Sequence, residues 1–496
     1  MSRRGTAITG AALLGGLAWR LWLMGRYYGW EESDYGNLAM VRGVLDGHFL
    51  HYDMNHMPGY YGLAAVVLAV VGDTVVAARA VSLVGGLVAL WLALRLARHL
   101  AGDRAAAVTG LLLVFQPEFA LYAATSLREP LYAAFVLGCL LMLGRERLVA
   151  AGALAGAAFL VRFDAAVILG LVMAAHALGR GPRLRRLVAA STPLLAAIAA
   201  WSTYTWIDHG TPLFWQHAVA VNVETGLGAE AEGRLQWVAN GLAVSASLFA
   251  RVLPSRIGWG PWLGLFAACL WTPWRRHGLP RTATTLALAM LGFWLSIGFV
   301  GQHSPDHNLY WKWLCPVVPV AVPVAIAGLL RLLAGLPPTA GRVVLGIAVL
   351  QALVAGFVET GRQVRRSAAW YGPQLHLARW IEEEVPVDVP LLIDNIPACW
   401  IDRRPHERAM TSWFDVPVPP GDPEAFAAWL RQEGIGWVLW FREEWTQAPV
   451  IAPFLADGGD WRAGGVHLHE VAREDGYGWI LFAVEGVAGP ERPPPL

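Results

Sequence analysis

The sequence predicts an α-helical membrane protein that crosses the bilayer many times and carries a small α/β domain near its C-terminal end. The first observation is composition: of 496 residues, 56% are hydrophobic and only 15% are charged, whereas soluble proteins carry roughly 25% charged residues. The second is that apolar runs of about 17–25 residues, the length needed to span a bilayer, recur through most of the chain. The third is a change after Ala368, where proline, charged and polar turn residues become frequent.

About 11 spanning helices are expected from the apolar runs. They are 6–24, 75–98, 105–124, 129–144, 147–161, 164–179, 187–207, 257–273, 283–301, 314–333 and 341–359. Two further apolar stretches, 59–72 and 238–253, are interpreted as helices that lie in the membrane interface. The membrane domain is expected to cover residues 1–365.

The arginine-containing loops predict the orientation, because loops rich in Lys and Arg remain on the cytoplasmic side. These loops are 95–104, 145–147, 180–186, 275–281 and 331–342. They share one side if the two interfacial stretches do not cross. The N-terminus is therefore predicted to be cytoplasmic in a multi-pass protein of the cell membrane. The outer side receives the loops 26–72, 126–129, 208–256 and 301–313.

Residues 366–490 are predicted to form a small α/β domain, placed outside the cytoplasm by the number of spans before it. The expected elements are helices 374–384 and 423–433 and strands 389–394, 437–441, 467–471 and 479–484. The start of the second helix is supported by Asp422-Pro423, because aspartate is a preferred N-cap and proline is favoured at the first helical position.

Charge and cysteine usage exclude several classes of function. The net charge of +1 argues against nucleic acid as a partner, since binding to it depends on a basic face. The four cysteines are far apart in the chain, so no disulfide framework and no CxxC site is implied. No glycine-rich phosphate loop is visible that would bind a nucleotide.

Three carboxylates, Glu31, Glu32 and Asp34, follow directly after the first predicted span. Acidic residues beside hydrocarbon are costly, so such a cluster is a functional-site hypothesis by default. A solvated acidic loop is the structural alternative.

Other polar residues gather on the same predicted outer face. They are His48, His51, Asp53, His56 and Tyr60 in the first loop, Arg128-Glu129 in the second, and His303, His307, Tyr310 and Lys312 in the last. Carboxylates beside membrane-level cations suit one task in particular: a base activates an acceptor while cations hold the phosphate of a lipid-borne donor. The histidines and Asp53 could also bind a divalent metal, although their spacing is irregular and no metal ligand is assigned.

The order of these parts resembles the GT-C class of polyprenyl-phosphate-dependent membrane glycosyltransferases, especially the group of protein O-mannosyltransferases, lipid A aminoarabinose transferases and RgtABCD-like enzymes. The matching segments, over roughly residues 1–330, are Glu31-Glu32-Ser33-Asp34-Tyr35, His56-Met57-Pro58-Gly59-Tyr60-Tyr61, Gly72 with Arg79-Ala80, Glu129-Pro130-Leu131, Arg162 and Lys312-Trp313-Leu314-Cys315-Pro316-Val317-Val318-Pro319. Three positions depart from the family pattern. Glu31 and Glu129 stand where the family usually has aspartate. Lys312 stands where the family has arginine, so it would bind phosphate as a point charge and not through two parallel hydrogen bonds.

The resemblance implies a GT-C-like fold and transfer of a sugar from a polyprenyl-phosphate carrier to a glycan, lipid or protein acceptor, with inversion at the anomeric carbon. Glu31 would take the proton of the acceptor, with Glu32 or Asp34 as the alternatives. Glu129 would orient the acceptor or hold a cation. The remaining candidate residues for substrate binding are Arg128, His56, Tyr60, His307, Tyr310 and Lys312.

Structural readings of the same residues stay open. Glu129 could serve the dipole at a helix start, Lys312 could extend its amine to the membrane surface, and Arg162 is expected to pair with Asp164 or to cap a helix. Two other functions also remain: a transporter or flippase of a lipid-linked glycan, and a non-catalytic membrane scaffold.

Overall fold

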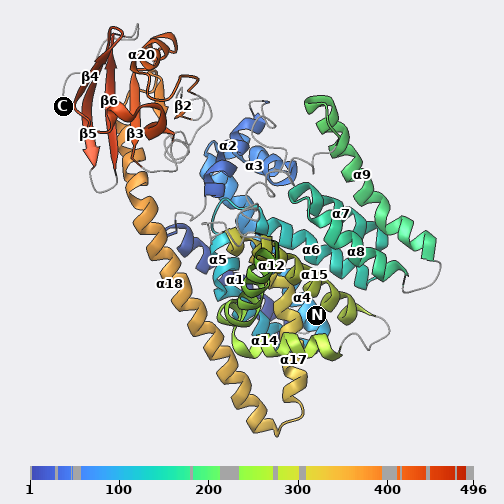
Figure 1. Cartoon of the computed structure of the whole chain (residues 1–496). Helices are drawn as coiled ribbons and strands as arrows, with labels where there is room; N and C mark the ends of the chain where they lie inside the picture. Colours follow the sequence, from blue (N-terminus) through green and yellow to red (C-terminus); the bar gives the residue numbers. More distant parts are fainter. Residues whose placement is uncertain are drawn as a thin grey trace. The chain divides into compact units, whose positions relative to one another are not determined.

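The computed structural model describes residues 3–27, 32–45, 47, 57–178, 183–212, 234–271, 278–300, 309–393, 410–413, 416–442, 447–474 and 478–486. They divide into two compact units (Figure 1). One contains Met1–Ala69 and Val76–Ser367, and the other contains Val70–Val75 and Ala368–Leu496. The predicted fold class is confirmed: the first unit is built from helices and the second contains a small sheet.

The helices of the membrane region follow the apolar runs of the sequence. They are α1 (Arg3–Met24), α2 (Glu32–Leu45), α3 (Pro58–Val71), α4 (Thr74–Phe115), α5 (Pro117–Tyr122), α6 (Glu129–Gly144), α7 (Leu148–Val161), α8 (Ala165–Leu178), α9 (Arg183–His209), α12 (Arg234–Ser247), the π-helix η1 (Leu248–Val252), α13 (Leu253–Ile257), α14 (Trp259–Trp271), α15 (Leu279–Val300), α16 (Leu309–Leu314), α17 (Val318–Leu333) and α18 (Pro338–Glu384).

Among the described residues, six helices are long and apolar enough to cross a membrane. They are Arg3–Met24, Thr74–Phe115, Arg183–Ile207, Leu235–Ile257, Leu279–Phe299 and Pro338–Ala369. Six shorter apolar helices accompany them, namely Pro58–Val71, Glu129–Gly144, Leu148–Val161, Ala165–Leu178, Trp259–Leu270 and Val318–Leu333. The chain is therefore a multi-pass membrane protein.

The 42-residue helix α4 consists of two helices joined at a break. Ala101 and Gly102 have non-helical backbone angles, and Gly102 has a φ of 82°, a conformation that glycine adopts without steric cost. The predicted loop at 95–104 is thus present in a compact form. The third predicted span, 105–124, is wrong in one respect, because the helix ends at Phe115 and Pro117 starts α5. Proline lacks the N–H that would continue the preceding helix.

The segment Leu235–Ile257 is long enough to span, yet the sequence predicts part of it as an interfacial helix. In the middle of the segment, Ser245 Oγ donates to the carbonyl of Leu295 in α15, at 3.1 Å. Near its end, Arg256 lies 3.2 Å from Glu118 of α5. The interfacial placement of 238–253 stays a prediction.

Helix α18 differs from the prediction of a span over 341–359 and a separate helix over 374–384. It is continuous from Pro338 to Glu384. Glu359, the last residue of the predicted span, accepts hydrogen bonds from Arg362 at 3.0 Å and from Gln363 at 2.9 Å, both in the polar stretch that was expected to separate the two helices. Such pairs three and four residues apart stabilise a helix, so the polar composition does not interrupt it.

The C-terminal unit contains a six-stranded sheet in the order β2-β1-β3-β6-β5-β4. Its strands are β1 (Leu391–Ile393), β2 (Met410–Ser412), β3 (Trp437–Phe441), β4 (Asp460–Ala463), β5 (Val466–Glu474) and β6 (Trp479–Glu485). β1 is parallel to β2 and β3, and the pairs from β3 onward are antiparallel. The four predicted strands are present, whereas β2 and β4 were not predicted.

Helix α20 (Pro423–Gln432) packs beside this sheet (Figure 1). As predicted, Asp422 caps it, and its carboxylate accepts from the backbone N–H of Glu424 and Ala425 at 3.1 and 3.0 Å. The core beneath is aromatic, with the rings of Trp413 and Phe426 stacked at 5.7 Å. The indole N–H of Trp413 donates to the carbonyl of Leu439 at 2.7 Å, which satisfies its one buried polar group.

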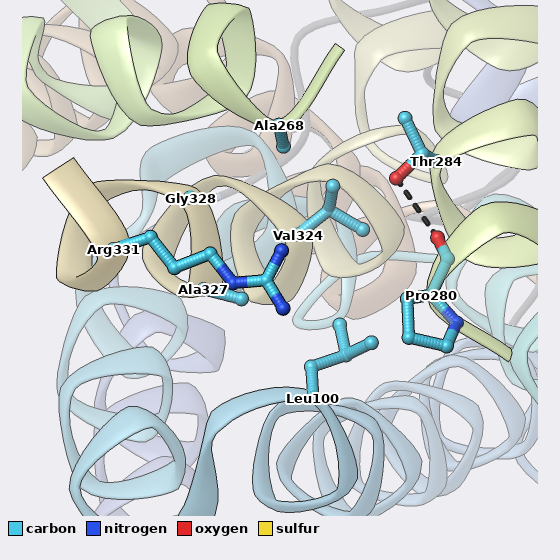
Figure 2. Close-up of a pocket in the computed structure, with 8 residues that line it drawn as sticks. All are labelled: Leu100, Ala268, Pro280, Thr284, Val324, Ala327, Gly328 and Arg331. Atoms are coloured by element: carbon cyan, nitrogen blue, oxygen red, sulfur yellow. Dashed lines mark hydrogen bonds between the residues drawn. The ribbon is translucent and has the colours of Figure 1, made fainter. Parts of the chain in front are cut away.

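Among the described residues, the membrane helices leave a small cavity and a larger groove between them. The smaller, about 20 Å³, has room for about one water molecule and is lined by residues of α4, α14, α15 and α17. In Figure 2 the side chain of Arg331 extends from α17 toward the middle of this ring, and the hydroxyl of Thr284 donates to the carbonyl of Pro280. The larger cavity is a groove between α4 and α6.

Candidate functional site

The turn of residues 126–129, which leads into α6, is the centre of the candidate site. Arg128 is the N-cap of α6, and Glu129 and Pro130 occupy its first positions. Proline is favoured there because its missing N–H has no helical partner, and an acidic side chain is stabilised by the helix dipole. Glu129 is nevertheless only 1% exposed, so this carboxylate is buried instead of solvated.

Arg162, directly after α7, provides the partner for this buried carboxylate. Its Nη1 lies 2.6 Å from Oε1 of Glu129, and its Nε lies 3.0 Å from Oδ1 of Asp164. All three side chains are at most 5% exposed. The predicted Arg162–Asp164 pair is confirmed, but the guanidinium also bridges to Glu129. Buried charges are tolerated when such pairing and hydrogen bonding compensate for lost hydration.

The segment around Lys312 reaches the same cluster through its neighbour Trp313. The guanidinium carbon of Arg162 lies 3.7 Å from the centroid of the Trp313 ring, a close cation–π contact. Lys312 precedes Trp313 on α16 and is partly exposed. The predicted phosphate-binding segment is therefore adjacent to the cluster of Arg162 and Glu129.

At the start of α6, two polar atoms of Arg128 and Glu129 have no hydrogen-bond partner among the described residues. They are Oε2 of Glu129 and Nη1 of Arg128, and both atoms are buried. A buried polar atom without a partner is costly, so each is a candidate contact for a bound substrate. Glu129 thus has one oxygen fixed by Arg162 and the other open, while Arg128 Nε lies 3.9 Å from the fixed oxygen.

Helix α2, which starts within the acidic cluster at Glu32, is held against this turn. The side-chain amide of Asn37 on α2 donates to the carbonyl of Ser126 at 2.9 Å, and the hydroxyl of Tyr61 on α3 donates to Oδ1 of Asn37 at 2.6 Å. All three residues are buried. Since one turn of helix is 3.6 residues, the backbone at Asp34, three residues before Asn37, is one turn away from the contact with the turn at 126–129.

Tyr60, predicted to bind substrate, is fully buried and its hydroxyl donates to the carbonyl of Ala78 on α4 at 3.0 Å. It also lies 3.2 Å from Oγ of Ser82, which donates to the carbonyl of Leu127 at 2.6 Å. Tyr60 is therefore connected to the 126–129 turn through the hydroxyl of Ser82. Its role in substrate binding stays a prediction.

Several predicted site residues are not placed. Glu31, His56 and His307 lie outside the described residues, as do His48, His51, Asp53 and His303 of the possible metal site. For Glu32, Asp34 and Tyr310 the backbone alone is described. Within the part of the chain that the structure describes, no group of three or more His, Cys, Asp or Glu residues could hold a metal ion.

Four residues of the cluster were not predicted as site residues: Asn37, Tyr61, Asp164 and Trp313. For two of them the sequence offered a signal, because Asp164 is two positions from Arg162 and Trp313 adjoins Lys312. Asn37 and Tyr61 are joined to the site by hydrogen bonds between distant segments, which no local pattern reveals.

The buried cluster makes Arg162 a stabilising residue. Replacing it with methionine leaves the carboxylates of Glu129 and Asp164 buried without their cation, so we expect a loss of about 3–5 kcal/mol in stability, measured by thermal unfolding of the purified protein in detergent. Arg362→Met is the matched control, since that arginine pairs with Glu359 at 3.0 Å but is 60% exposed and its loss should cost at most about 1 kcal/mol. Equal shifts for both variants would contradict the expected role.

Comparison with known proteins agrees with the resemblance inferred from the motifs. Residues 55–207, which include Tyr60, the 126–129 turn and Arg162, match the family model of dolichyl-phosphate-mannose-protein mannosyltransferase. No curated protein sequence is similar enough to be matched.

Solved structures with the same fold cover nearly the whole chain. The crystal structure of ArnT from Cupriavidus metallidurans bound to undecaprenyl phosphate superposes with a TM-score of 0.64 at 17% identity, over 98% of this chain and 99% of that chain. The apo state of the same protein gives a TM-score of 0.61 at 16% identity over the same shares. The chain therefore has the fold of the GT-C class of membrane glycosyltransferases, the class that its motifs resemble.

Proposed function

We propose that this protein transfers a sugar from a polyprenyl-phosphate donor to an acceptor on the outer side of the cell membrane, with inversion at the anomeric carbon. Three findings support the proposal: the ordered motifs, the family match over residues 55–207, and the fold shared with an ArnT whose crystal holds undecaprenyl phosphate. The N-terminus is proposed to be cytoplasmic and the C-terminal α/β domain to lie outside.

The observation that carries the proposal is the state of Glu129. Its Oε1 is fixed by Arg162 at 2.6 Å, while its Oε2 is buried without a hydrogen-bond partner among the described residues. A carboxylate held in this way is preorganised, so it can accept a hydrogen bond from an acceptor hydroxyl, or hold a cation, without first rearranging.

In the proposed reaction a carboxylate of the first loop takes the proton of the acceptor hydroxyl. Glu31 is assigned as this base from the family resemblance, with Glu32 and Asp34 as the alternatives. The acceptor oxygen attacks the anomeric carbon from the face opposite the phosphate, so the new glycosidic bond forms as the carbon–oxygen bond to the phosphate breaks. The bond electrons leave with polyprenyl phosphate, and the configuration is inverted.

The charge that develops on the leaving phosphate requires cations close to the turn. Arg128 offers Nη1, which has no partner among the described residues, and Lys312 stands beside Trp313, which contacts Arg162. We assign phosphate binding to these two residues, together with His307 and Tyr310. Because a lysine contributes a compact charge, the planar contacts to the phosphate would come from Arg128.

The test is a transfer assay with purified protein in liposomes and a panel of radiolabelled polyprenyl-phosphate sugars. We expect at least one donor to be consumed, with release of polyprenyl phosphate and no reaction with nucleotide sugars. Failure of every donor, together with unaltered surface glycans in cells that lack the protein, would overturn the proposal. Movement of an intact lipid-linked glycan across the bilayer without bond cleavage would identify a transporter instead.

A further inference from the structure

The groove between α4 and α6 lies outside the proposed catalytic site. Its volume is about 420 Å³, within the range of roughly 300–1,000 Å³ that is common for small-molecule sites. Its lining residues are Val84, Gly85, Val88, Trp91, Leu92 and Arg95 of α4, Leu131, Ala134, Phe135, Gly138, Leu141 and Met142 of α6, and Arg145 and Leu154 beyond it. Twelve of these fourteen residues are uncharged, and the two that are charged are both arginines.

The lining residues follow one face of each helix. On α4 they recur at Val84, Val88, Leu92 and Arg95, with the three- and four-residue spacing that places side chains in a row. Val84 and Val88 are 59% and 40% exposed, so this row opens to the outside of the bundle. At a rise of 1.5 Å per residue, the distance from Val84 to Arg95 is about 16 Å, close to half the ~30 Å thickness of the hydrocarbon core.

The two ends of the groove differ in chemistry. At one end α4 and α6 touch, since a Cβ on Gly85 would lie 2.7 Å from the Cα of Leu131, and Leu131 is two residues from Glu129. At the other end are Arg95 and Arg145. The guanidinium of Arg95 lies over the ring of Trp91 at 4.8 Å, a contact that leaves its N–H groups available to an anion.

We propose that this groove binds an anionic membrane phospholipid, with an acyl chain along α4 and α6 and the phosphate held by Arg95 and Arg145. An apolar channel the length of one leaflet that ends at two cations matches such a lipid in both shape and charge. Basic pockets between membrane helices are a recognised site for anionic head groups. By the positive-inside rule, the lipid belongs to the cytoplasmic leaflet.

The position of the cations distinguishes this lipid from the sugar donor. The donor phosphate is proposed to lie near Arg128, at the Leu131 end of the groove. The two arginines lie at the opposite end, where only a lipid that enters from the other leaflet can place its phosphate. Because α6 begins with Glu129, the bound lipid stabilises the helix pair that holds the catalytic turn.

The test is native mass spectrometry and thermal unfolding of the delipidated full-length protein after addition of phosphatidylglycerol or phosphatidylcholine in mixed micelles. We expect one phosphatidylglycerol molecule to be retained preferentially and to raise the unfolding temperature. The double variant R95Q/R145Q should weaken this retention about tenfold or more, because two cations close to an anionic head group are removed. Arg147→Gln is the matched control, since Arg147 is exposed and does not line the groove.

A second variant tests the groove without changing its charge. Val88→Trp fills the apolar channel at a half-exposed position, so it should also reduce retention of phosphatidylglycerol while the protein remains folded. The inference is overturned if the two phospholipids are retained equally, if neither variant alters retention, or if polyprenyl phosphate displaces phosphatidylglycerol from the groove. None of these readouts requires sugar transfer, so they are independent of the proposed catalytic function.

Discussion

Glu129→Gln is expected to lower kcat/KM for transfer from a polyprenyl-phosphate donor about 10²–10³-fold, the usual effect of removing one preorganised polar group. The amide has nearly the same size and its oxygen can still accept the hydrogen bond from Arg162, so the fold is retained. The negative charge is lost, however, and with it the strong acceptor that Oε2 offers to a substrate hydroxyl or a cation. The measurement is the initial rate of product formation in liposomes at several donor concentrations.

Glu146→Gln is the matched control for this variant. Glu146 pairs with Arg186 and lies 3.3 Å from His176. It lies between α6 and α7, in the loop predicted to be cytoplasmic. Its replacement should leave the rate of transfer unchanged. If Glu129→Gln keeps full activity and only lowers the unfolding temperature, then Glu129 only stabilises the first turn of α6 and the ion pair with Arg162. The proposed catalytic role is then wrong.

The sequence predicted those elements whose signals are local. An apolar run of sufficient length predicted α1, and Asp422 with Pro423 located the start of α20. The elements that the sequence predicted wrongly or missed also have physical explanations. Pro117 ended a helix within a run that is otherwise apolar, and β2 and β4 are strands of three and four residues that depend on their sheet neighbours instead of their own pattern.

The candidate site was predictable only in part. The motif at Glu129 and the pairing of Arg162 with Asp164 could be inferred from residue types and spacing. The link from Arg162 to Glu129 joins residues 33 positions apart and depends on how α6 and α7 pack. That packing is close because Gly138 faces Leu154, where an added Cβ would lie 3.2 Å from Cδ1. No single-sequence pattern encodes such a distance.

The contact of Asn37 with Ser126 has a consequence for the choice of base. Residues three apart on a helix share a face, whereas residues five apart do not. Asp34 is three positions before Asn37 and therefore belongs to the face of α2 that meets the 126–129 turn. Glu32 is five positions before Asn37 and belongs to a different face. Helix geometry thus ranks Asp34 above Glu32 as the alternative to Glu31.

This ranking yields the last prediction, a comparison of Glu31→Gln, Glu32→Gln and Asp34→Asn in the same transfer assay. Removal of the base should lower kcat about 10²–10⁴-fold, and the family resemblance assigns this loss to Glu31→Gln. Asp34→Asn should have the larger effect of the two changes on α2, because its position is closer to the Ser126 contact. Each substitution keeps the size of the side chain, so unfolding temperatures should stay near that of the unsubstituted protein.

The pH dependence of the remaining activity separates a base from a binding group. Loss of the base should abolish the rise in kcat with pH that ionisation of a carboxylate produces, while loss of a group that only binds the acceptor should raise KM and leave that rise in place. A larger loss for Glu32→Gln than for both other variants would show that the face of α2 carrying Asn37 is not the one presented to the substrate. Full activity of all three variants would show that none of the three carboxylates Glu31, Glu32 and Asp34 is the base.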